Sequence, residues 1–152
     1  MSTIVVDTNH LVALIDPKDV WHAVANEIES CLPVHVTRVF VDVVLTEAAS
    51  VFARRCEERK DVEAFPRLIS LLKSRIPSSF ITWISPQIPM LYEKCLKLML
   101  ESDGSLNFND SLITLYMREQ KLSYIASFDK DFDTVKGLKR CASPADAVKF
   151  FG

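Results

Sequence analysis

Short apolar, β-branched segments alternate with amphipathic helical patterns along this chain, and the alternation constrains its fold more than any other feature. The first segment, TIVV at residues 3–6, is a continuous apolar run typical of a strand buried on both faces. Further strands are predicted at residues 34–36, 80–84, 124–126 and 138–141. Strands that alternate with helices form a mostly parallel sheet covered by helices on both faces. The sequence therefore predicts an α/β fold with a mostly parallel sheet of four to five strands.

Helices are predicted between these strands, where apolar residues recur every three or four positions. Thr8 and Asn9 can cap a short helix that ends at Asp16-Pro17, and a long helix is predicted at residues 40–56. A helix at 61–75 contains Pro66, which shifts its start later. The other helices are predicted from Trp21 to Cys31, at 91–100, from a cap at Asn107 or Asn109 to about Gln120, and at 145–151.

The length and the charge of the chain narrow its class. Its 152 residues fit one domain, and no repeat, linker or low-complexity segment divides them, so residues 1–152 are predicted to form a single domain. The formal charge is −2, whereas a broad sequence-independent DNA binder would be basic. Nucleic acid is not excluded, but its phosphate contacts are expected to be local or supplied by a bound metal.

Apolar runs and cysteines bear on location and on metal binding. No apolar run approaches the roughly 18 residues needed to cross a bilayer, and no basic leader precedes a long apolar core. We therefore expect a soluble cytoplasmic protein with no membrane partner. The four cysteines are widely spaced without a CxxC pair, which argues against zinc and for buried thiols that act as small apolar side chains.

Two aspartates occupy positions where ligands bind in open α/β sheets, beyond the carboxyl ends of the strands, and a third lies at the start of a helix. Asp7 follows the first predicted strand, and Asp129 follows the strand at 124–126. Asp110 lies in the first turn of the helix that precedes that strand, where the helix dipole favours a carboxylate. Each residue has a structural alternative, because a strand-end Asp can cap a turn and Asp110 can be a helix-start charge.

Glu47 lies on the apolar face of the predicted long helix. Its neighbours at helical spacing are Val43, Val44 and Val51, and no Lys or Arg shares that stripe within one turn. Arg54 and Arg55 are further along the helix and partly offset. Burying an unpaired carboxylate is costly, so Glu47 is expected to bind a metal, unless it lies at the rim of the core and reaches water.

The four acids point to one kind of chemistry if they converge. Carboxylates that share a site raise each other's pKa values unless a cation is present. Ligand sets made only of oxygen select hard cations such as Mg²⁺ or Mn²⁺. The chemistry that such a site supports is phosphodiester hydrolysis, in which a bound cation activates water.

The order of these residues resembles the PIN-domain ribonucleases, including the VapC-like toxins of toxin–antitoxin pairs. The resemblance covers nearly the whole chain and rests on four elements: V-V-D-T-N after the first strand, a Glu on the second main helix, F-N-D-S-L-I, and S-F-D-K-D-F. The last of these is the most specific, with Ser in place of a commoner Thr. The resemblance implies a Rossmann-like three-layer α/β/α sandwich, single-stranded RNA as substrate, Mg²⁺ or Mn²⁺ as cofactor, and products with a 5′-phosphate and a 3′-hydroxyl.

The resemblance also implies roles for individual residues. It carries over Asp7, Glu47 and Asp110 as the main catalytic and metal-site acids, with Asp129 as the fourth. Asp131 competes with Asp129 for that place, although the D-F pair is more suited to anchoring a turn, and Asp133 is expected to be solvated. The predicted supporting residues are Thr8 and Asn9 beside the first acid, and Ser127, which would steady the acidic loop through backbone or carboxylate.

Partners follow less directly from the sequence. A VapC-like toxin would be held inactive by an antitoxin that covers the acidic cleft, and such proteins often form homodimers. The apolar residues at 62–72 can serve a homodimer or the core. Lys130 and Arg38 are candidates for RNA contact or for solvated surface charge.

Several competing functions remain open at this point. One is a PIN-domain nuclease that processes ribosomal or other RNA without an antitoxin, and another is a catalytically idle PIN-fold binding protein. A phosphatase with Asp7 as nucleophile would ordinarily begin D-x-D-x-T, but Asn9 stands at the second Asp. Nucleases for structured DNA are generally longer and carry DNA-binding elements that this chain lacks.

Overall fold

The β-branched segments form one sheet in the computed structural model, which describes residues 2–152. Within this range the sheet has five strands, every pairing is parallel, and the strand order is β3-β2-β1-β4-β5. The strands are β1 (Thr3–Val6), β2 (Thr37–Val41), β3 (Ile81–Thr82), β4 (Tyr124–Ala126) and β5 (Lys139–Cys141). In the central strand, Val5 pairs with Val39 on one side and with Ile125 on the other. The predicted parallel α/β fold is confirmed.

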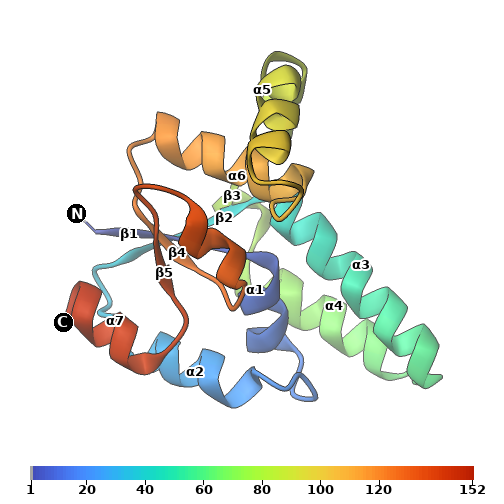
Figure 1. Cartoon of the computed structure of the whole chain (residues 1–152). Helices are drawn as coiled ribbons and strands as arrows, with labels where there is room; N and C mark the ends of the chain where they lie inside the picture. Colours follow the sequence, from blue (N-terminus) through green and yellow to red (C-terminus); the bar gives the residue numbers. More distant parts are fainter. Residues whose placement is uncertain (1) are drawn as a thin grey trace.

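Seven α-helices in residues 2–152 cover both faces of the sheet (Figure 1). They are α1 (Thr8–Ile15), α2 (His22–Cys31), α3 (Asp42–Arg59), α4 (Ala64–Arg75), α5 (Ile88–Glu101), α6 (Phe108–Glu119) and α7 (Pro144–Phe151). Short 3₁₀ helices are η1 (Ser78–Phe80), η2 (Ser85–Gln87) and η3 (Lys130–Thr134). In Figure 1, α2 and α7 lie on one side of the sheet and α5 and α6 on the other.

The alternation of side chains along the strands divides the core between these two layers. Ile4 faces a smaller cluster that includes Ile28 of α2 and Phe151 of α7. Val5 faces a larger cluster that includes Phe52 of α3 and Leu112 of α6. All of these side chains are buried, so burial of apolar surface from two layers holds the strands between them. The three-layer prediction is confirmed.

The second strand and the helix that follows it lie later in the chain than predicted. Residues 34–36 form a turn closed by a hydrogen bond from Val36 N–H to Pro33 O, with Val34 fully exposed. The strand is β2, and α3 begins at Asp42 rather than at residue 40. The prediction was wrong because apolar residues continue from Val39 to Val44 through the strand into the helix, interrupted only by Asp42, so periodicity does not mark the boundary.

Other features of the elements resolve alternatives that the sequence left open. Asp7, rather than Thr8 or Asn9, caps α1, since its Oδ1 accepts a hydrogen bond from the backbone N–H of Thr8 at 2.8 Å. Asn107 caps α6, and α4 begins later than residue 61, as Pro66 predicted. Three of the four cysteines are buried in the core and all four are free. Within residues 2–152, no helix has the length and apolar character needed to cross a membrane.

Candidate active site

Asp7 stands where β1 ends, at the carboxyl edge of the sheet. Its backbone N–H donates to Ala126 O at 3.0 Å, which continues the pairing of β1 with β4 and sets the side chain beside the end of both strands. Oδ1 accepts from Thr8 N–H at 2.8 Å, and Oδ2 accepts from the hydroxyl of Ser127 at 2.6 Å. Burial raises the pKa of Asp7 to about 6 even though both hydrogen bonds lower it, and the charges of Glu47 and Asp129 raise it further.

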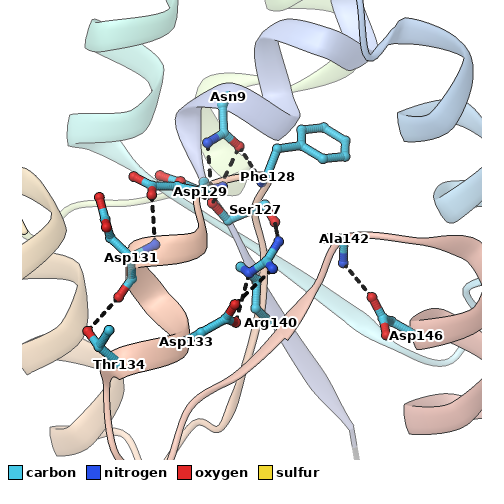
Figure 2. Close-up of polar contacts among 11 residues, drawn as sticks. Asn9, Ser127, Phe128, Asp129, Asp131, Asp133, Thr134, Arg140, Ala142 and Asp146 are labelled. Carbon is cyan, nitrogen blue, oxygen red and sulfur yellow. Dashed lines mark hydrogen bonds and ion pairs between the residues drawn. The ribbon is translucent and has the colours of Figure 1, made fainter. Parts of the chain in front are cut away.

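Ser127 joins the turn after β4 to the end of β1. Besides donating to Asp7, its Oγ accepts from the backbone N–H of Asp129 at 3.0 Å and from Asn9 Nδ2 at 3.3 Å. The Oδ1 of Asn9 accepts from Phe128 N–H at 2.9 Å, so the Asn9 amide bridges two successive residues of this turn (Figure 2). Since Ser127 is fully buried, these bonds fix Asp129 relative to Asp7.

Replacement of Ser127 with Ala is expected to raise the pKa of Asp7 above its present value of about 6. A hydrogen bond to the ionised carboxylate stabilises that form by roughly 1.5–3 kcal/mol, so its loss corresponds to a rise of about one pH unit or more. A carbon NMR titration of the Asp7 carboxyl measures this directly. Ser123→Ala, at the residue before β4, is the control and should leave the titration unchanged. An unaltered pKa of Asp7 in Ser127→Ala would contradict the expectation.

Glu47 approaches the same region from α3. Its side chain is half-buried, and Oε2 accepts from Asn109 Nδ2 of α6 at 3.3 Å. The sequence indicated that this carboxylate needs a partner, and within residues 2–152 its hydrogen-bond partner is an amide rather than a cation. A neutral amide satisfies one lone pair but does not neutralise the charge.

Asp110 has a structural role and also lies among the other acids. It is the third residue of α6 and forms a capping box with Asn107: its N–H donates to Asn107 Oδ1 at 2.8 Å, and its Oδ2 accepts from Asn107 N–H at 3.0 Å. Burial raises the pKa of Asp110 to about 7, and the charges of Asp7, Asp129 and Glu47 add to the rise. Asp110 therefore both caps the start of α6 and lies near the other acids.

Asp129 and Asp131 differ in where they point. Asp129 lies against the same cavity as Asp7, and its Oδ1 accepts from Asp131 N–H at 2.9 Å, which caps η3 (Figure 2). Asp131 is absent from the lining of that cavity. Phe132 is fully buried and anchors the 3₁₀ turn, so the D-F pair has the anchoring position that the sequence indicated. Of the two, Asp129 is the one that lies in the cavity with the other acids.

Asp133 is exposed to solvent, as expected from the sequence, and it also forms an ion pair. Arg140 donates to its two carboxylate oxygens at 2.9 Å each, and also to the carbonyl oxygen of Ser127 at 3.2 Å (Figure 2). The guanidinium lowers the pKa of Asp133. The bidentate pair ties η3 to β5, and it thereby supports the turn that carries Asp129.

The four predicted acids line one cavity of about 390 Å³ beyond the carboxyl ends of the strands. Thr8 and Asn9, which the sequence placed beside the first acid, also line it. The whole lining consists of Asp7, Thr8, Asn9, Val12, Asp19, Val20, Trp21, Glu47, Val51, Arg54, Arg55, Asn107, Asp110 and Asp129. Residues far apart in the sequence thus meet at the edge where open α/β sheets bind ligands.

Comparison with known families decides what kind of domain this is. The family profile described as the PIN domain matches residues 4–138, which is most of the chain. The chain belongs to the PIN-domain family. The resemblance inferred from the order of the acids is therefore confirmed.

A solved structure shares the fold of this PIN domain. VapC20 of Mycobacterium tuberculosis, described as a toxin that cleaves the sarcin-ricin loop, matches with a TM-score of 0.67 and 21% sequence identity. The match covers 89% of this chain and 96% of VapC20. At this identity the likeness establishes a common fold. No curated protein sequence matches the chain significantly.

The donor set of the PIN domain suits a hard divalent cation, although the acids are not drawn together tightly. In residues 2–152, no group of three or more His, Cys, Asp or Glu side chains lies close enough to hold a metal ion. The carboxylates nonetheless share one cavity, and the charges on the others raise the pKa values of Asp7 and Asp110. Oxygen donors that repel each other in this way fit Mg²⁺ or Mn²⁺, whose binding would offset the repulsion.

Several residues of the PIN-domain cavity were not predicted from the sequence. Arg54 was noted only as partly offset from Glu47, yet its spacing of seven residues returns close to the same helix face and it lines the cavity. Trp21 and Asp19 gave no comparable signal, because they reach the cavity from the loop before α2. Arg38, a candidate for RNA contact or for solvated charge, lies on β2. There it pairs with Glu29 at 3.2 Å and donates to three backbone carbonyls, so its guanidinium is bound within the chain.

Proposed function

We propose that this chain is a single-domain, metal-dependent endoribonuclease that hydrolyses phosphodiester bonds of single-stranded RNA. The observation that supports this most strongly is the convergence of Asp7, Glu47, Asp110 and Asp129 on one cavity at the carboxyl edge of a parallel sheet. Two of these carboxylates are desolvated enough to have pKa values of about 6 and about 7. Carboxylates so perturbed in a cleft are typical of a functional site rather than of surface charge.

We propose Mg²⁺ or Mn²⁺ as the cofactor, held by these same four acids. A divalent cation there would lower the pKa of a bound water and offset charge on the phosphate. The remaining contributions come from the protein. Ser127 and the Thr8 amide hold Asp7 in one orientation, and the capping box holds Asp110. Asp110 or Glu47 would accept the proton of the attacking water, and the exposed guanidinium of Arg54 adds a positive charge to the cavity wall.

The geometry of η3 allows a sharp test, because Asp129 and Asp131 are two residues apart and only one of them lines the cavity. We expect Asp129→Asn to lower RNA cleavage by about 100-fold or more, since even residues that merely support metal ligands commonly contribute 10- to 100-fold. Asp131→Asn should retain nearly full activity. Asn at 129 keeps an oxygen that can accept from the N–H of residue 131, so the turn should persist. The assay is cleavage of a labelled single-stranded RNA with Mg²⁺ or Mn²⁺ present, and equal rates for the two variants would contradict this assignment.

We further propose that the protein is the VapC-like toxin of a toxin–antitoxin pair, on the basis of its fold likeness to VapC20. An antitoxin would inhibit it by covering the acidic cavity. An RNA-processing nuclease without an antitoxin, or an idle PIN-fold binding protein, is the alternative. The second alternative predicts no cleavage by the wild-type chain under any metal condition, and co-purification with the product of a neighbouring small gene would favour the toxin.

A homodimer remains part of the proposal. In the segment 62–72, Leu68 and Leu72 are buried and Phe65 and Ile69 are half-buried against the core of the same chain, whereas Val62 and Leu71 are exposed. Further exposed apolar side chains lie on α5, at Met90, Tyr92 and Leu100. These are better suited to contact a second copy of the chain.

A further inference from the structure

The cavity that holds the acids has an exposed aromatic wall. Trp21 lies at the N-terminal boundary of α2 with 47% of its surface exposed, and the adjacent Val20 is 88% exposed. Both residues line the cavity. A large apolar surface left in water at the mouth of a cleft is typical of a binding surface rather than of a core.

The indole ring of Trp21 is held in place on one face. It stacks on Phe128 with a centroid distance of 4.8 Å and an interplanar angle of 11°. Phe128 directly precedes Asp129, and its backbone N–H is bound by Asn9. The position of the indole is therefore set by the same turn that sets the fourth acid.

The backbone of Trp21 is held in place by Asp19, which is itself bound by a side chain of α3. Its N–H donates to Asp19 Oδ1 at 2.8 Å, while Asp19 Oδ2 accepts from Arg55 at 2.8 Å. The next residue, His22, donates from Nδ1 to the carbonyl of Ala13 at 2.7 Å, which closes the corner between α1 and α2. A ring that is already ordered loses little conformational entropy when a planar ligand stacks on it.

A positively charged side chain lies on the same wall of the cavity. Arg54 is exposed on α3, lines the same cavity, and forms no ion pair or side-chain hydrogen bond with residues 2–152. Arg55, in contrast, is paired with Asp16 and Asp19. Arg54 is therefore free to contact a phosphate next to the site.

We propose that Trp21 forms a stacking subsite for one unpaired nucleobase of the RNA substrate, beside the phosphate that is cleaved, and that Arg54 contacts a neighbouring phosphate. This inference rests on the proposed nuclease function. Every nucleobase presents a planar face, so the subsite tolerates any base and binds purines more tightly than pyrimidines because their rings are larger. It also requires an unpaired base, so the subsite predicts a preference for single strands.

Fluorescence of Trp21 tests the contact directly. The chain has two tryptophans, so Trp83→Phe leaves Trp21 as the only one, and Asp7→Asn in the same chain prevents cleavage during the titration. Addition of a short single-stranded RNA should quench the emission of Trp21, and the same RNA with an abasic site at the stacked position should quench it much less. RNA that binds, as shown by anisotropy of a label, without quenching Trp21 would overturn the subsite.

Substitutions test what the contact contributes. Trp21→Ala should weaken RNA affinity and raise KM by about 10-fold or more, with a smaller change in kcat, and Trp21→Phe should recover most of the loss. Trp83→Ala removes a similarly exposed tryptophan outside the cavity and should leave affinity unchanged. Arg54→Gln should weaken binding of all RNA sequences. It should also reduce by about one the number of counterions released on binding, as measured from the slope of log affinity against log salt concentration.

The outcomes separate this inference from the function on which it rests. If the wild type cleaves RNA and Trp21→Ala binds RNA with unchanged affinity, the stacking subsite alone is overturned. The exposed ring would then be assigned to contact with a protein partner. A wild-type chain that neither binds nor cleaves RNA would overturn the proposed function and the subsite with it. Equal loss in Trp21→Ala and Trp21→Phe would also overturn stacking, since Phe retains an aromatic face.

Discussion

Asp7→Asn is expected to lower RNA cleavage by more than about 100-fold while the chain stays folded. Asp7 is the most buried of the four acids, and it is bound to the end of β4 through Ala126 and Ser127. Asn has nearly the same shape and keeps an oxygen that can accept from Thr8 N–H, but it lacks the negative charge needed to hold a cation. The effect should therefore appear in cleavage and in metal affinity rather than in the fold.

The measurement is cleavage of labelled RNA together with thermal unfolding of each variant. Asp61→Asn serves as a control, because Asp61 also accepts a hydrogen bond from a backbone N–H at the start of a helix and pairs with a lysine, yet it is absent from the cavity lining. Asp61→Asn should cleave RNA at the wild-type rate. A well-folded Asp7→Asn variant with full activity would refute the proposed mechanism.

The stability of the metal-free protein should fall as the pH rises through the pKa values of the buried acids. Asp7 and Asp110 have model-compound values of 3.8 but folded values of about 6 and about 7. At a pH between the unfolded and the folded pKa of each acid, the unfolded chain has released a proton that the folded chain still binds. The free energy of unfolding therefore decreases with increasing pH. For Asp7 alone the change corresponds to roughly 3 kcal/mol, at about 1.36 kcal/mol per pH unit. The two acids raise each other's pKa, so their contributions do not add.

Comparison of wild type with Asp7→Asn separates the loss of stability that Asp7 causes at rising pH from the contributions of acids that raise stability over the same change in pH. Glu29, Asp61 and Asp133 have lowered pKa values and stabilise the fold as the pH rises. Relative to wild type, Asp7→Asn should gain stability between about pH 4 and about pH 7 and keep that gain above it. Chemical denaturation across this range measures the difference, and a difference that does not vary with pH would contradict the expectation.

Added Mg²⁺ or Mn²⁺ should reverse the same destabilisation. Carboxylates must lose their protons before they bind a cation, so the gain in unfolding temperature should be larger near pH 8 than near pH 5. An ion at about 100 times its dissociation constant stabilises the folded state by about 2.7 kcal/mol. Asp7→Asn should lose most of this gain. An equal gain at both pH values would indicate binding elsewhere on the chain.

The sequence was most informative where local patterns decide structure. The strand at Tyr124–Ala126 was predicted to the residue, because a short apolar run there is bounded by polar residues on both sides. The start of α3 was misplaced because strand and helix share one apolar run. Period-based inference locates an element well only when the polarity pattern changes at its end.

The candidate site shows a similar division. Glu47 was singled out by a local argument, a carboxylate on an apolar stripe, and it does lie in the cavity with the other acids. Trp21 was not singled out as a site residue. Its stacking on Phe128 joins residues more than one hundred positions apart, and such a contact leaves no periodic pattern in the sequence. Contacts of this kind depend on how the β1 and β4 ends meet, which no local pattern specifies. The catalytic roles of the acids themselves stay predictions.

The position of β4 beside β1 has a consequence for synthesis of the protein on the ribosome. Asp7 is among the first residues made, yet its neighbour strand and Asp129 belong to the last quarter of the chain. A growing chain has no Ser127 hydroxyl for Asp7 and no complete set of acids until that last quarter emerges. Shorter nascent fragments lack part of the acidic cavity, so the proposed activity requires that translation of the fold be nearly complete.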